Sequence, residues 1–324
     1  MKKALSVIVP AYNVSAYIKT ALDSILKAKK AVEAVEVIVV NDGSTDDTLQ
    51  IVEKYSNNYP ETIRVINKEN GGHGSGINVG LRSSEGLYIK ILDGDDWFDQ
   101  KGLERLVDYI IKEDEKPDLI INPYERIWEN GKKQITEYLQ GSGQSHQDFS
   151  VVNSNNYTLS LHSITIRKSL FSENDIPCID ENISYDDMEY ILYPVPYVKT
   201  IVFLEDIVYQ YRFGTADQSM NPLQMVKKLS MHTKVISSLD NYYQKTKDQF
   251  DEEQKRYYLR EYVDTIGTNC YLRIKSNQKY AEIRDFLLQY HNYPLSQTGM
   301  TQMRLVLKYK RFGYLLCRIR NLFA

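Results

Sequence analysis

The first 120 residues alternate short apolar runs with helical patterns, and this alternation constrains the fold more than any other feature of the chain. The apolar runs cover residues 5–9, 35–40, 63–66, 87–92 and 119–121. The helical patterns between them cover residues 16–28, 45–58, 75–84 and 100–113. Strands that are apolar on both faces and separated by helices are typical of βαβ units. We therefore expect an α/β fold with a mostly parallel, Rossmann-like sheet flanked by helices.

The pattern changes near residue 120 and again near residue 221. A hairpin is predicted around Asn130-Gly131, a polar loop at 141–156, strands at 161–167 and 201–212, and a helix at 187–193. Later residues have helical spacing, with one apolar seam formed by Met225, Leu229, His232, Ile236, Leu239 and Tyr243 and another by Leu259, Val263, Ile266 and Cys270. We divide the chain into 1–120, 121–220 and a helical region at 221–324.

Charge and cysteine content exclude several classes of protein. The 324 residues hold 40 basic and 43 acidic side chains, so no overall positive field predicts nucleic-acid binding. Three distant cysteines predict neither a disulfide framework nor a metal knuckle, and a reduced cytoplasmic setting is expected. The start has too short an apolar stretch for a signal peptide, and no run approaches the roughly 18 apolar residues of a membrane span.

The clearest candidate site is Asp93-Gly94-Asp95-Asp96, directly after the fourth predicted strand. In parallel sheets, ligands bind beyond the carboxyl ends of the strands. Three neighbouring carboxylates repel one another unless a cation lies among them, and Mg²⁺ or Mn²⁺ prefers such oxygen ligands. Gly94 would let a ligand approach the backbone. The alternative, an acidic helix N-terminus, explains Asp96 better than Asp93.

The first and second predicted strands also end in polar residues. Asp42 stands where an acid can accept hydrogen bonds from a base or ribose, whereas Ser44 and Asp47 predict a capping box for the next helix. That reading makes Asp46 and Asp47 structural. Tyr12 can present its ring to a base, and the alternative is a turn followed by a helix cap from Asn13.

Three further features have both a functional and a structural interpretation. The loop Gly71-Gly72-His73-Gly74 precedes a predicted helix, as phosphate-binding loops do, although no Gly-Lys-Ser/Thr follows it. His73 could contact a diphosphate, and the alternative is that its side chain is simply solvated. Asp186-Asp187 precedes an apolar helix and is also explained by capping. Arg212 is the last residue of a predicted strand, and its side chain could bind a phosphate or pair with an acid at the rim of the sheet.

These motifs together resemble those of family 2 glycosyltransferases, which have the GT-A fold. The matching segments run from Ser6 to Asn13, Val37 to Asp46, Asn70 to Gly80 and Leu92 to Trp97. The resemblance implies a metal-dependent enzyme that moves a sugar from a nucleoside diphosphate donor, usually a UDP-sugar, to an acceptor hydroxyl with inversion. It also implies a place in surface polysaccharide or glycoprotein glycan synthesis.

The resemblance assigns roles to individual residues. Pro10, Tyr12 and Asp42 would hold the uracil and ribose, and Asp187 would be the catalytic base. Asp93-Gly94-Asp95 would be the DxD motif, with Asp95 binding Mn²⁺ or Mg²⁺ and Asp93 contacting the ribose, the metal or its water. The remaining donor-site residues would be Asn13, Asn70, Gly72, His73 and Arg212. Many members have Ala-Arg-Asn where this chain has Gly76-Ile77-Asn78, so the diphosphate partner would be His73, Lys90 or Arg212 instead.

The last segment suggests an additional partner. Leu305, Tyr309, Phe312, Leu316, Ile319 and Phe323 have helical spacing. Residues 301–324 contain six basic residues and no acid, so they predict a basic amphipathic helix that suits an anionic membrane surface and a lipid-linked acceptor. Packing against the body or a second subunit is the alternative, and Gly313 weakens the helix.

Two other functions compete with glycosyl transfer. A sugar-phosphate nucleotidyltransferase would carry a phosphate loop after the first strand, where this chain has Pro10-Ala11-Tyr12-Asn13. A non-catalytic sugar-nucleotide-binding protein would not need Asp93, Asp95 and Asp187 together.

Overall fold

The computed structural model describes residues 3–138, 146–214 and 222–322. The chain forms two compact units, Met1–Thr215 and Ala216–Ala324, and each is described by itself. Among the helices of these described ranges, not one has the length and apolar character that crossing a membrane requires.

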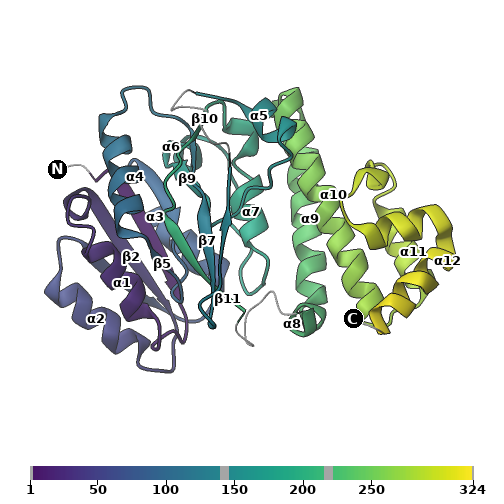
Figure 1. Ribbon diagram of the computed structural model, residues 1–324, viewed down its shortest axis with the longest axis horizontal. Helices are drawn as coiled ribbons and strands as arrows, with labels where there is room; N and C mark the ends of the chain where they lie inside the picture. The colour runs from purple at the N-terminus through teal and green to yellow at the C-terminus, as the bar shows by residue number, and fades with distance from the viewer. Residues whose placement is uncertain (1–2, 139–145, 215–221, 323–324) are drawn as a thin grey trace. The chain divides into compact units, whose positions relative to one another are not determined.

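The first unit is built on a seven-stranded sheet with the order β10-β6-β9-β4-β1-β2-β3 (Figure 1). Its strands are β1 Leu5–Ala11, β2 Val35–Asp42, β3 Ile63–Lys68, β4 Tyr88–Ile91, β6 Leu119–Ile121, β9 Ile164–Arg167 and β10 Ile201–Phe203. All neighbouring pairs are parallel except those of β9, which is antiparallel to β4 and β6. The predicted mostly parallel α/β fold is confirmed.

Helices cover both faces of this sheet because its central strands are buried on both sides. The helices that follow β1 to β4 are α1 Ile18–Leu26, α2 Thr48–Asn58, α3 His73–Ser83 and α4 Gln100–Lys112. Val7 and Val9 of β1 belong to the core that β1 shares with α1 and α4. Ile8 points to the other face, where Gly80 of α3 comes so close that an added Cβ would lie 2.2 Å from Ile8 Cγ2.

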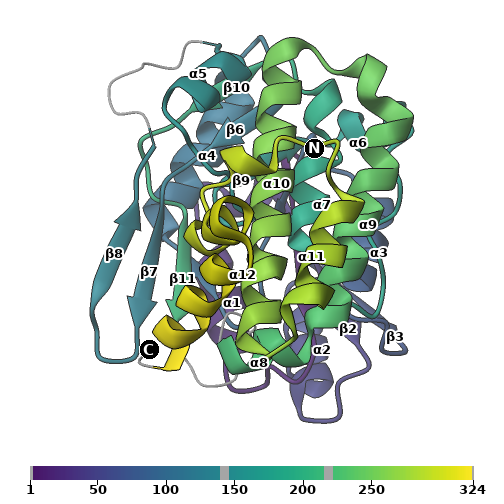
Figure 2. The same cartoon turned by 90° about the vertical axis from the view of Figure 1, so that its right-hand side faces the viewer.

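A second, four-stranded sheet has the order β5-β11-β7-β8. Its strands are β5 Trp97–Phe98, β7 Tyr124–Trp128, β8 Lys133–Thr136 and β11 Tyr209–Phe213, and Figure 2 shows β8, β7 and β11 next to one another. The predicted hairpin at Asn130-Gly131 is confirmed, and Gly131 has a positive φ of 78°. The predicted single strand at 201–212 is wrong, because the chain leaves the main sheet after β10 and enters the second sheet at β11.

Two local predictions in the first unit are wrong. The predicted loop at 141–156 contains the helix α5 Phe149–Ser154, which Asp148 caps, while 141–145 lie outside the described residues. The predicted capping box is absent: α2 begins at Thr48, whose backbone N–H donates to Asp46 Oδ1. Ser44 Oγ instead accepts from the backbone N–H of Asn13, so this serine joins two loops.

Two short helices complete the first unit, α6 Ser169–Glu173 and α7 Asp187–Leu192.

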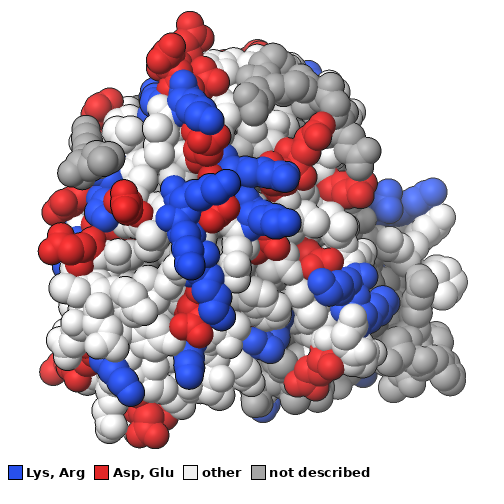
Figure 3. Space-filling view, turned by 60° about the vertical axis from the view of Figure 1, so that its left-hand side comes forward, with Lys and Arg blue, Asp and Glu red and all other residues white. Residues whose placement is uncertain are grey.

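The charged side chains of the first unit are mixed rather than separated by sign. In Figure 3 Lys and Arg gather near the middle of the visible face, with Asp and Glu among them. Exposed pairs such as Arg105 with Asp206 and Lys112 with Asp108 show the same mixing.

The second unit is helical, as predicted. Its helices are α8 Pro222–Lys227, α9 Leu229–Thr246, α10 Glu252–Lys275, α11 Tyr280–Gln289 and α12 Thr301–Leu322. The two predicted seams lie on helices that pack together, and His232, Ile236, Leu239, Val263, Ile266 and Cys270 are buried. Tyrosines fill much of the space between α9 and α10. The ring of Tyr243 stacks on Tyr258 at 5.5 Å, and Tyr258 OH donates to Leu239 O.

The predicted single amphipathic helix at the end of the chain is wrong. α12 bends sharply at Lys310, which has φ 52° and ψ −129°. The buried side chains beside this bend include Met303, Val306, Tyr314 and Cys317, whereas Tyr309, Phe312 and Leu316 of the predicted seam are exposed. The side chains of residues 319–322 and the placement of 323–324 lie outside the described part of the structure.

The contact between α3 and β1 yields a stability prediction. Gly80→Ala places a methyl group against Ile8 and should lower the free energy of unfolding by about 1–3 kcal/mol, the usual cost of overpacking a core. Urea denaturation measures this loss.

Ile8→Ala provides the matched test, because it removes all three side-chain atoms that the new methyl group meets. The double variant should therefore lose less stability than the sum of the single variants, by at least about 0.5 kcal/mol. Strict additivity, or a harmless Gly80→Ala, would contradict this packing.

Candidate functional site

The candidate site lies at the carboxyl edge of the main sheet, beyond β1, β2 and β4. There the chain leaves β4 and turns tightly, with the backbone N–H of Asp96 donating to Asp93 O at 3.0 Å. Asp96 is buried, and both of its carboxylate oxygens accept hydrogen bonds from β11, one from Tyr209 OH and one from the Arg212 backbone N–H, each at 2.7 Å. Asp96 thus ties the acidic turn to the second sheet, and Asp93 and Asp95 are the more accessible acids.

The three carboxyl groups of this turn influence one another. Burial, followed by the charge of Asp93, raises the pKa of Asp95 to about 6. Burial and the charges of Asp95 and Asp93 raise the pKa of Asp96 well above its usual value. Such mutual repulsion is what a bound divalent cation relieves, so the acids fit Mn²⁺ or Mg²⁺. The predicted ligands Asp95 and Asp93 are therefore neighbours at the rim.

His73, the first residue of α3, connects this acidic turn to a second pair of acids. Its Nδ1 lies 2.7 Å from Asp186 Oδ2, and its Nε2 lies 3.0 Å from Asp93 Oδ1. Burial alone would lower the pKa of His73, but the charges and hydrogen bonds of Asp186 and Asp93 raise it well above the usual value. Both ring nitrogens therefore donate, and His73 is an imidazolium ion between two carboxylates rather than a solvated side chain.

The same contact lowers the pKa of Asp93. Burial by itself would raise that pKa, but the hydrogen bond and the charge of His73, together with His162 and the hydroxyl group of Tyr209, lower it overall. Asp93 is consequently ionised while its neighbours Asp95 and Asp96 hold protons more tightly.

The acid pair Asp186-Asp187 lies at the start of α7. Asp186 is buried and contacts His73, and its side chain makes no capping hydrogen bond to the helix. Asp187 is the first residue of the helix and is exposed. The protein packed around its carboxyl group, followed by the charge of Asp186, raises the pKa of Asp187 to about 6. An accessible carboxyl group with this pKa can accept a proton near neutral pH.

Asp42 holds the glycine loop in place. Its carboxylate accepts from the backbone N–H groups of Gly71 and Gly72 at 2.9 and 2.8 Å and from Lys68 Nζ at 2.6 Å. Asn70 Nδ2 donates to the backbone oxygen of Asp42. Gly72 has φ +84°, a conformation that favours glycine, so the loop can turn directly into α3. The structure therefore brings Asp42, Asn70 and Gly72 together.

The loop after β1 lies beside the loop after β2. Asn13 has φ 53°, and its Oδ1 accepts from the backbone N–H of Thr45, so this side chain fixes a loop and does not cap α1, which begins at Ile18. Tyr12 is 51% exposed and leaves its ring accessible. Pro10 packs against Gly76, where an added Cβ would lie 3.1 Å from Pro10 Cβ.

The structure gives a different reason for a glycine at position 94 than the close approach of a ligand that the sequence suggested. An added Cβ would lie 2.9 Å from Val14 Cγ2 and 3.2 Å from Pro10 O. The space left by its missing side chain is thus taken by the loop after β1, and not by an open approach to the backbone.

Arg212, Lys90 and His73, the three side chains predicted as possible partners of the diphosphate, have different surroundings. Arg212 Nε donates to Asp95 O at 2.9 Å, and its guanidinium lies 4.7 Å from the Tyr17 ring centroid and 4.9 Å from that of Trp97. Lys90 is fully buried, donates to the backbone oxygens of His162 and Ile164, and has its pKa lowered by burial to about 7. His73 and Arg212 therefore flank the acidic turn, whereas Lys90 lies within the sheet.

His162 and Tyr209 were not predicted from the sequence, although both lie beside Asp93. His162 precedes β9, its ring stacks on Tyr211 at 4.2 Å, and its Nε2 lies 3.9 Å from Asp93 Oδ2. Burial lowers the pKa of His162 to about 4, so its ring is neutral. Within the described residues, ligand atoms of Asp93, Asp96 and His162 lie within 4.8 Å of one another, a second arrangement that can hold a metal ion. The only signal in the sequence that pointed to His162 was its position near the start of a predicted strand.

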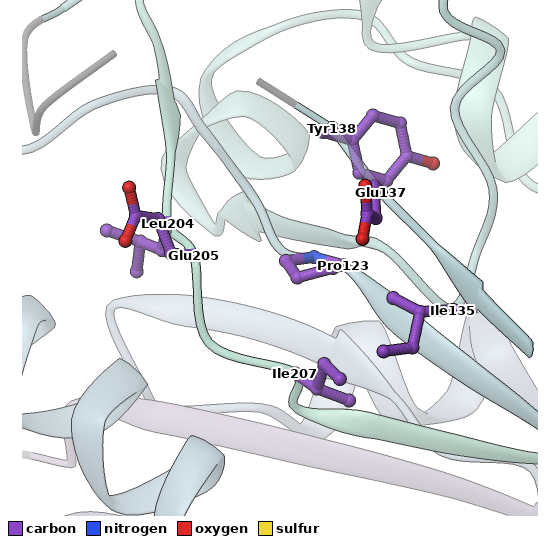
Figure 4. Close-up of a pocket in the computed structure, with 7 residues that line it drawn as sticks. All are labelled: Pro123, Ile135, Glu137, Tyr138, Leu204, Glu205 and Ile207. Atoms are coloured by element: carbon purple, nitrogen blue, oxygen red, sulfur yellow. The ribbon is translucent and has the colours of Figure 1, made fainter. Parts of the chain in front are cut away.

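A cavity of about 310 Å³ lies apart from these residues. It is lined by Pro123, Ile135, Glu137, Tyr138, Leu204, Glu205 and Ile207 (Figure 4). Pro123 follows β6 and Leu204 follows β10, so the cavity borders the same edge of the sheet as Asp93. No predicted donor-site residue lines it.

Comparison with known proteins identifies the family. The sequence model of Glycosyl transferase family 2 matches residues 6–173, more than half of the chain. The chain therefore belongs to the family 2 glycosyl transferases, and the predicted family is confirmed.

Individual relatives cover parts of the chain. The poly(ribitol-phosphate) β-N-acetylglucosaminyltransferase TarS of Staphylococcus aureus is 31% identical over 207 residues, which are 64% of this chain and 35% of that protein. The minor teichoic acid biosynthesis protein GgaB of Bacillus subtilis is 36% identical over 118 residues, 36% of this chain and 13% of that protein. The chain thus spans about a third or less of the length of these curated relatives.

Solved structures show the same fold. S. aureus TarS residues 1–349 in complex with UDP-GlcNAc matches 98% of this chain and 90% of that one, with a TM-score of 0.67 and 24% identity. A mannosyltransferase from Pyrobaculum calidifontis in complex with GDP-Man and Mn²⁺ matches 99% of this chain and 88% of that one, with a TM-score of 0.52 and 14% identity. The predicted GT-A-like fold is confirmed by the first match.

The His73 contacts predict a pH-dependent contribution to stability. The pKa of His73 is raised in the folded state, so its stabilising contribution is complete below the unfolded pKa of about 6.5 and is lost as pH rises through the folded pKa. The stability advantage of the wild type over His73→Gln should therefore shrink above about pH 6.5, by up to roughly 1.4 kcal/mol per pH unit.

Urea unfolding of both proteins in metal-free buffer at several pH values measures this difference. An advantage that is constant or grows above neutral pH would contradict a charged His73.

Proposed function

We propose that this protein is a metal-dependent, inverting glycosyltransferase that moves a sugar from a UDP-sugar to an acceptor hydroxyl. The observation that carries the proposal is the position of His73 between Asp93 and Asp186. This contact joins the DxD acids to the acid pair of α7, so a group that binds the donor and a group that can act as a base belong to one site. The proposal extends to surface polysaccharide or glycoprotein glycan synthesis, in keeping with the names of TarS, a poly(ribitol-phosphate) β-N-acetylglucosaminyltransferase, and GgaB, a minor teichoic acid biosynthesis protein.

The nucleotide end of the donor is assigned to the loops after β1, β2 and β3. The accessible ring of Tyr12 suits stacking on uracil, with Pro10 and Asn13 shaping the loop beneath it. Asp42 already accepts from the glycine loop, but a carboxylate has about four lone-pair sites and can also accept from a base or ribose. Asn70 and Gly72 border the same position.

The diphosphate end is assigned to the acidic turn. Asp95 and Asp93 would hold Mn²⁺ or Mg²⁺, and when bound the ion would supply positive charge for the leaving diphosphate. Arg212 and His73 flank these acids and replace the arginine that many family members carry where this chain has Ile77. The aromatic rings of Tyr17 and Trp97 hold the Arg212 guanidinium in a fixed orientation beside Asp95.

We assign Asp187 the role of the base that accepts the proton of the acceptor hydroxyl. Inversion requires the base and the leaving group on opposite sides of the sugar carbon, and α7 presents Asp187 beside Asp186, across His73 from Asp93. The raised pKa of about 6 makes Asp187 a stronger base than an ordinary aspartate while leaving most of it ionised at neutral pH.

We assign donor binding to residues 1–120 and acceptor binding to 121–220. The cavity in Figure 4 supports the second assignment, because its two carboxyl groups can accept from sugar hydroxyls while its aliphatic walls contact the C–H faces of a ring. The acceptor is assigned as a glycan, free or lipid-linked. Residues 221–324 are assigned to a peripheral position on the inner face of the cell membrane, through the basic segment 301–324.

Asp187→Asn tests the base. Removing a positioned base should lower the rate of transfer by about 10²–10⁴ and leave the affinity for UDP-sugar nearly unchanged. UDP release in the presence of acceptor measures the rate, and calorimetric titration of UDP-sugar measures the affinity. The matched control is Asp175→Asn, an exposed acid in the segment before α7. A rate within about tenfold of wild type would rule out Asp187 as the base.

Asp95→Asn tests the metal site. A ligand that binds only the folded protein raises its stability, by about 2.7 kcal/mol at a hundredfold excess over Kd. Thermal unfolding with UDP should therefore show a rise in Tm that depends on Mn²⁺ in the wild type and is lost in the variant. Asp108→Asn, which removes an exposed acid of α4, should keep that rise. An Asp95→Asn protein with the full Mn²⁺-dependent rise would contradict the assignment.

A further inference from the structure

The end of the second unit forms a helical hairpin. At Gly313 an added Cβ would lie 2.0 Å from Leu305 O, and Cys317 Sγ lies 3.8 Å from Gln302 O. These two contacts place the segments before and after Lys310 side by side and antiparallel. Gly313 is required because the backbone of the first segment occupies the position that a side chain would need. We call residues 308–312 the hairpin tip.

Hydrogen bonds from its second segment and buried side chains from both segments attach the hairpin to the rest of its unit. Tyr314 OH donates to Gln278 O at 2.9 Å, and Arg318 donates to Asn277 Oδ1 at 2.8 Å. Met303, Val306, Tyr314 and Cys317 are buried on the inner side. The tip is therefore presented by a packed structure and is not a frayed helix end.

The tip and the turn after it expose an unusual combination of side chains. Tyr309 is 44% exposed, Phe312 62%, and Leu315 and Leu316 are also exposed. Lys308, Lys310 and Arg311 are exposed between and beside them. Several large apolar side chains exposed within eight consecutive residues indicate a binding site, because the surface of a soluble protein rarely carries a contiguous apolar patch.

The charge of this segment indicates what it binds. Residues 301–324 contain six basic residues and no acid. This differs from the basic cluster of the first unit, where acids lie among the Lys and Arg side chains (Figure 3). Aromatic rings partition to the interface of a bilayer, and Lys and Arg reach the phosphate groups of anionic lipids.

We propose that the hairpin tip inserts into the surface of an anionic membrane. Tyr309 and Phe312, followed by Leu315 and Leu316, enter the boundary between headgroups and acyl chains, while Lys308, Lys310 and Arg311 bind lipid phosphates. The inference rests on the peripheral location proposed above and specifies the residues and the lipid charge responsible for it. A second copy of the chain, or a further protein segment, is the competing occupant of the same surface.

Co-sedimentation with vesicles tests the proposal. The protein should bind vesicles of phosphatidylglycerol and phosphatidylcholine in equal parts and should bind vesicles of phosphatidylcholine alone far more weakly. Raising the salt concentration should weaken binding, because exposed charges are screened. Equal binding to both kinds of vesicle, or to neither, would overturn the proposal.

Two sets of substitutions separate the contributions. Tyr309→Ser with Phe312→Ser should weaken binding at least about tenfold through lost apolar burial. Lys308→Gln, Lys310→Gln and Arg311→Gln together should weaken it about a hundredfold, at roughly fivefold per cation. The matched controls are Leu288→Ser, an exposed leucine of α11, and Lys245→Gln with Lys247→Gln, two exposed lysines of the same unit. Controls that weaken binding as much as the tip variants would overturn the proposal.

Two readouts without vesicles complete the test. Metal-dependent UDP release should be unchanged in the tip variants, so a failure of membrane binding is distinguished from a failure of the proposed transferase activity. Light scattering should give the same mass for the wild type and the variants. An oligomer that dissociates on Tyr309→Ser with Phe312→Ser would show that a second copy covers the tip, and the membrane proposal would then be wrong.

Discussion

A positively charged imidazole ring between two carboxylates is the interaction on which the candidate site depends. His73 is delivered by the glycine loop after β3, Asp93 by the end of β4 and Asp186 by the start of α7. Asp42 fixes the glycine loop through two backbone N–H groups and so sets the position of His73. Asp42 at the end of the second strand is thus connected to Asp186 through the hydrogen-bonded glycine loop and the His73 side chain that follows it. The contact with His73 also helps to lower the pKa of Asp93.

The second sheet provides the other support. β11 passes the acidic turn and satisfies both oxygens of buried Asp96 through Tyr209 and the Arg212 backbone. Because an unpaired buried carboxyl group would be costly, this contact fixes the turn and leaves Asp95 and Asp93 as the groups that face the proposed donor. The same strand carries the Arg212 side chain to the Asp95 carbonyl between two aromatic rings. One strand thus orders both the acids and a cation at the rim.

The sequence predicted the parts of the site that follow from local patterns. Asp42, Gly72 and Asp93 lie at or after the carboxyl ends of the parallel strands β2, β3 and β4, which meet at one edge of the sheet, so their proximity was predictable. His162 and Tyr209 were not, because they depend on the antiparallel strand β9 and on a change of sheet between β10 and β11. The hairpin in α12 was missed because regular spacing of apolar residues does not reveal where a helix folds back, although Gly313 was visible as a weak position.

The central claim is that a cation and a diphosphate share the rim of the sheet with Asp93 and Asp95. A crystal structure with UDP-sugar and Mn²⁺, in which the anomalous signal of manganese locates the ion, tests it most directly. The account predicts the manganese peak in contact with the Asp95 carboxylate and a diphosphate oxygen, with Arg212 or His73 beside the phosphates. Manganese and donor bound elsewhere, with both carboxylates still held by their present neighbours, would contradict it.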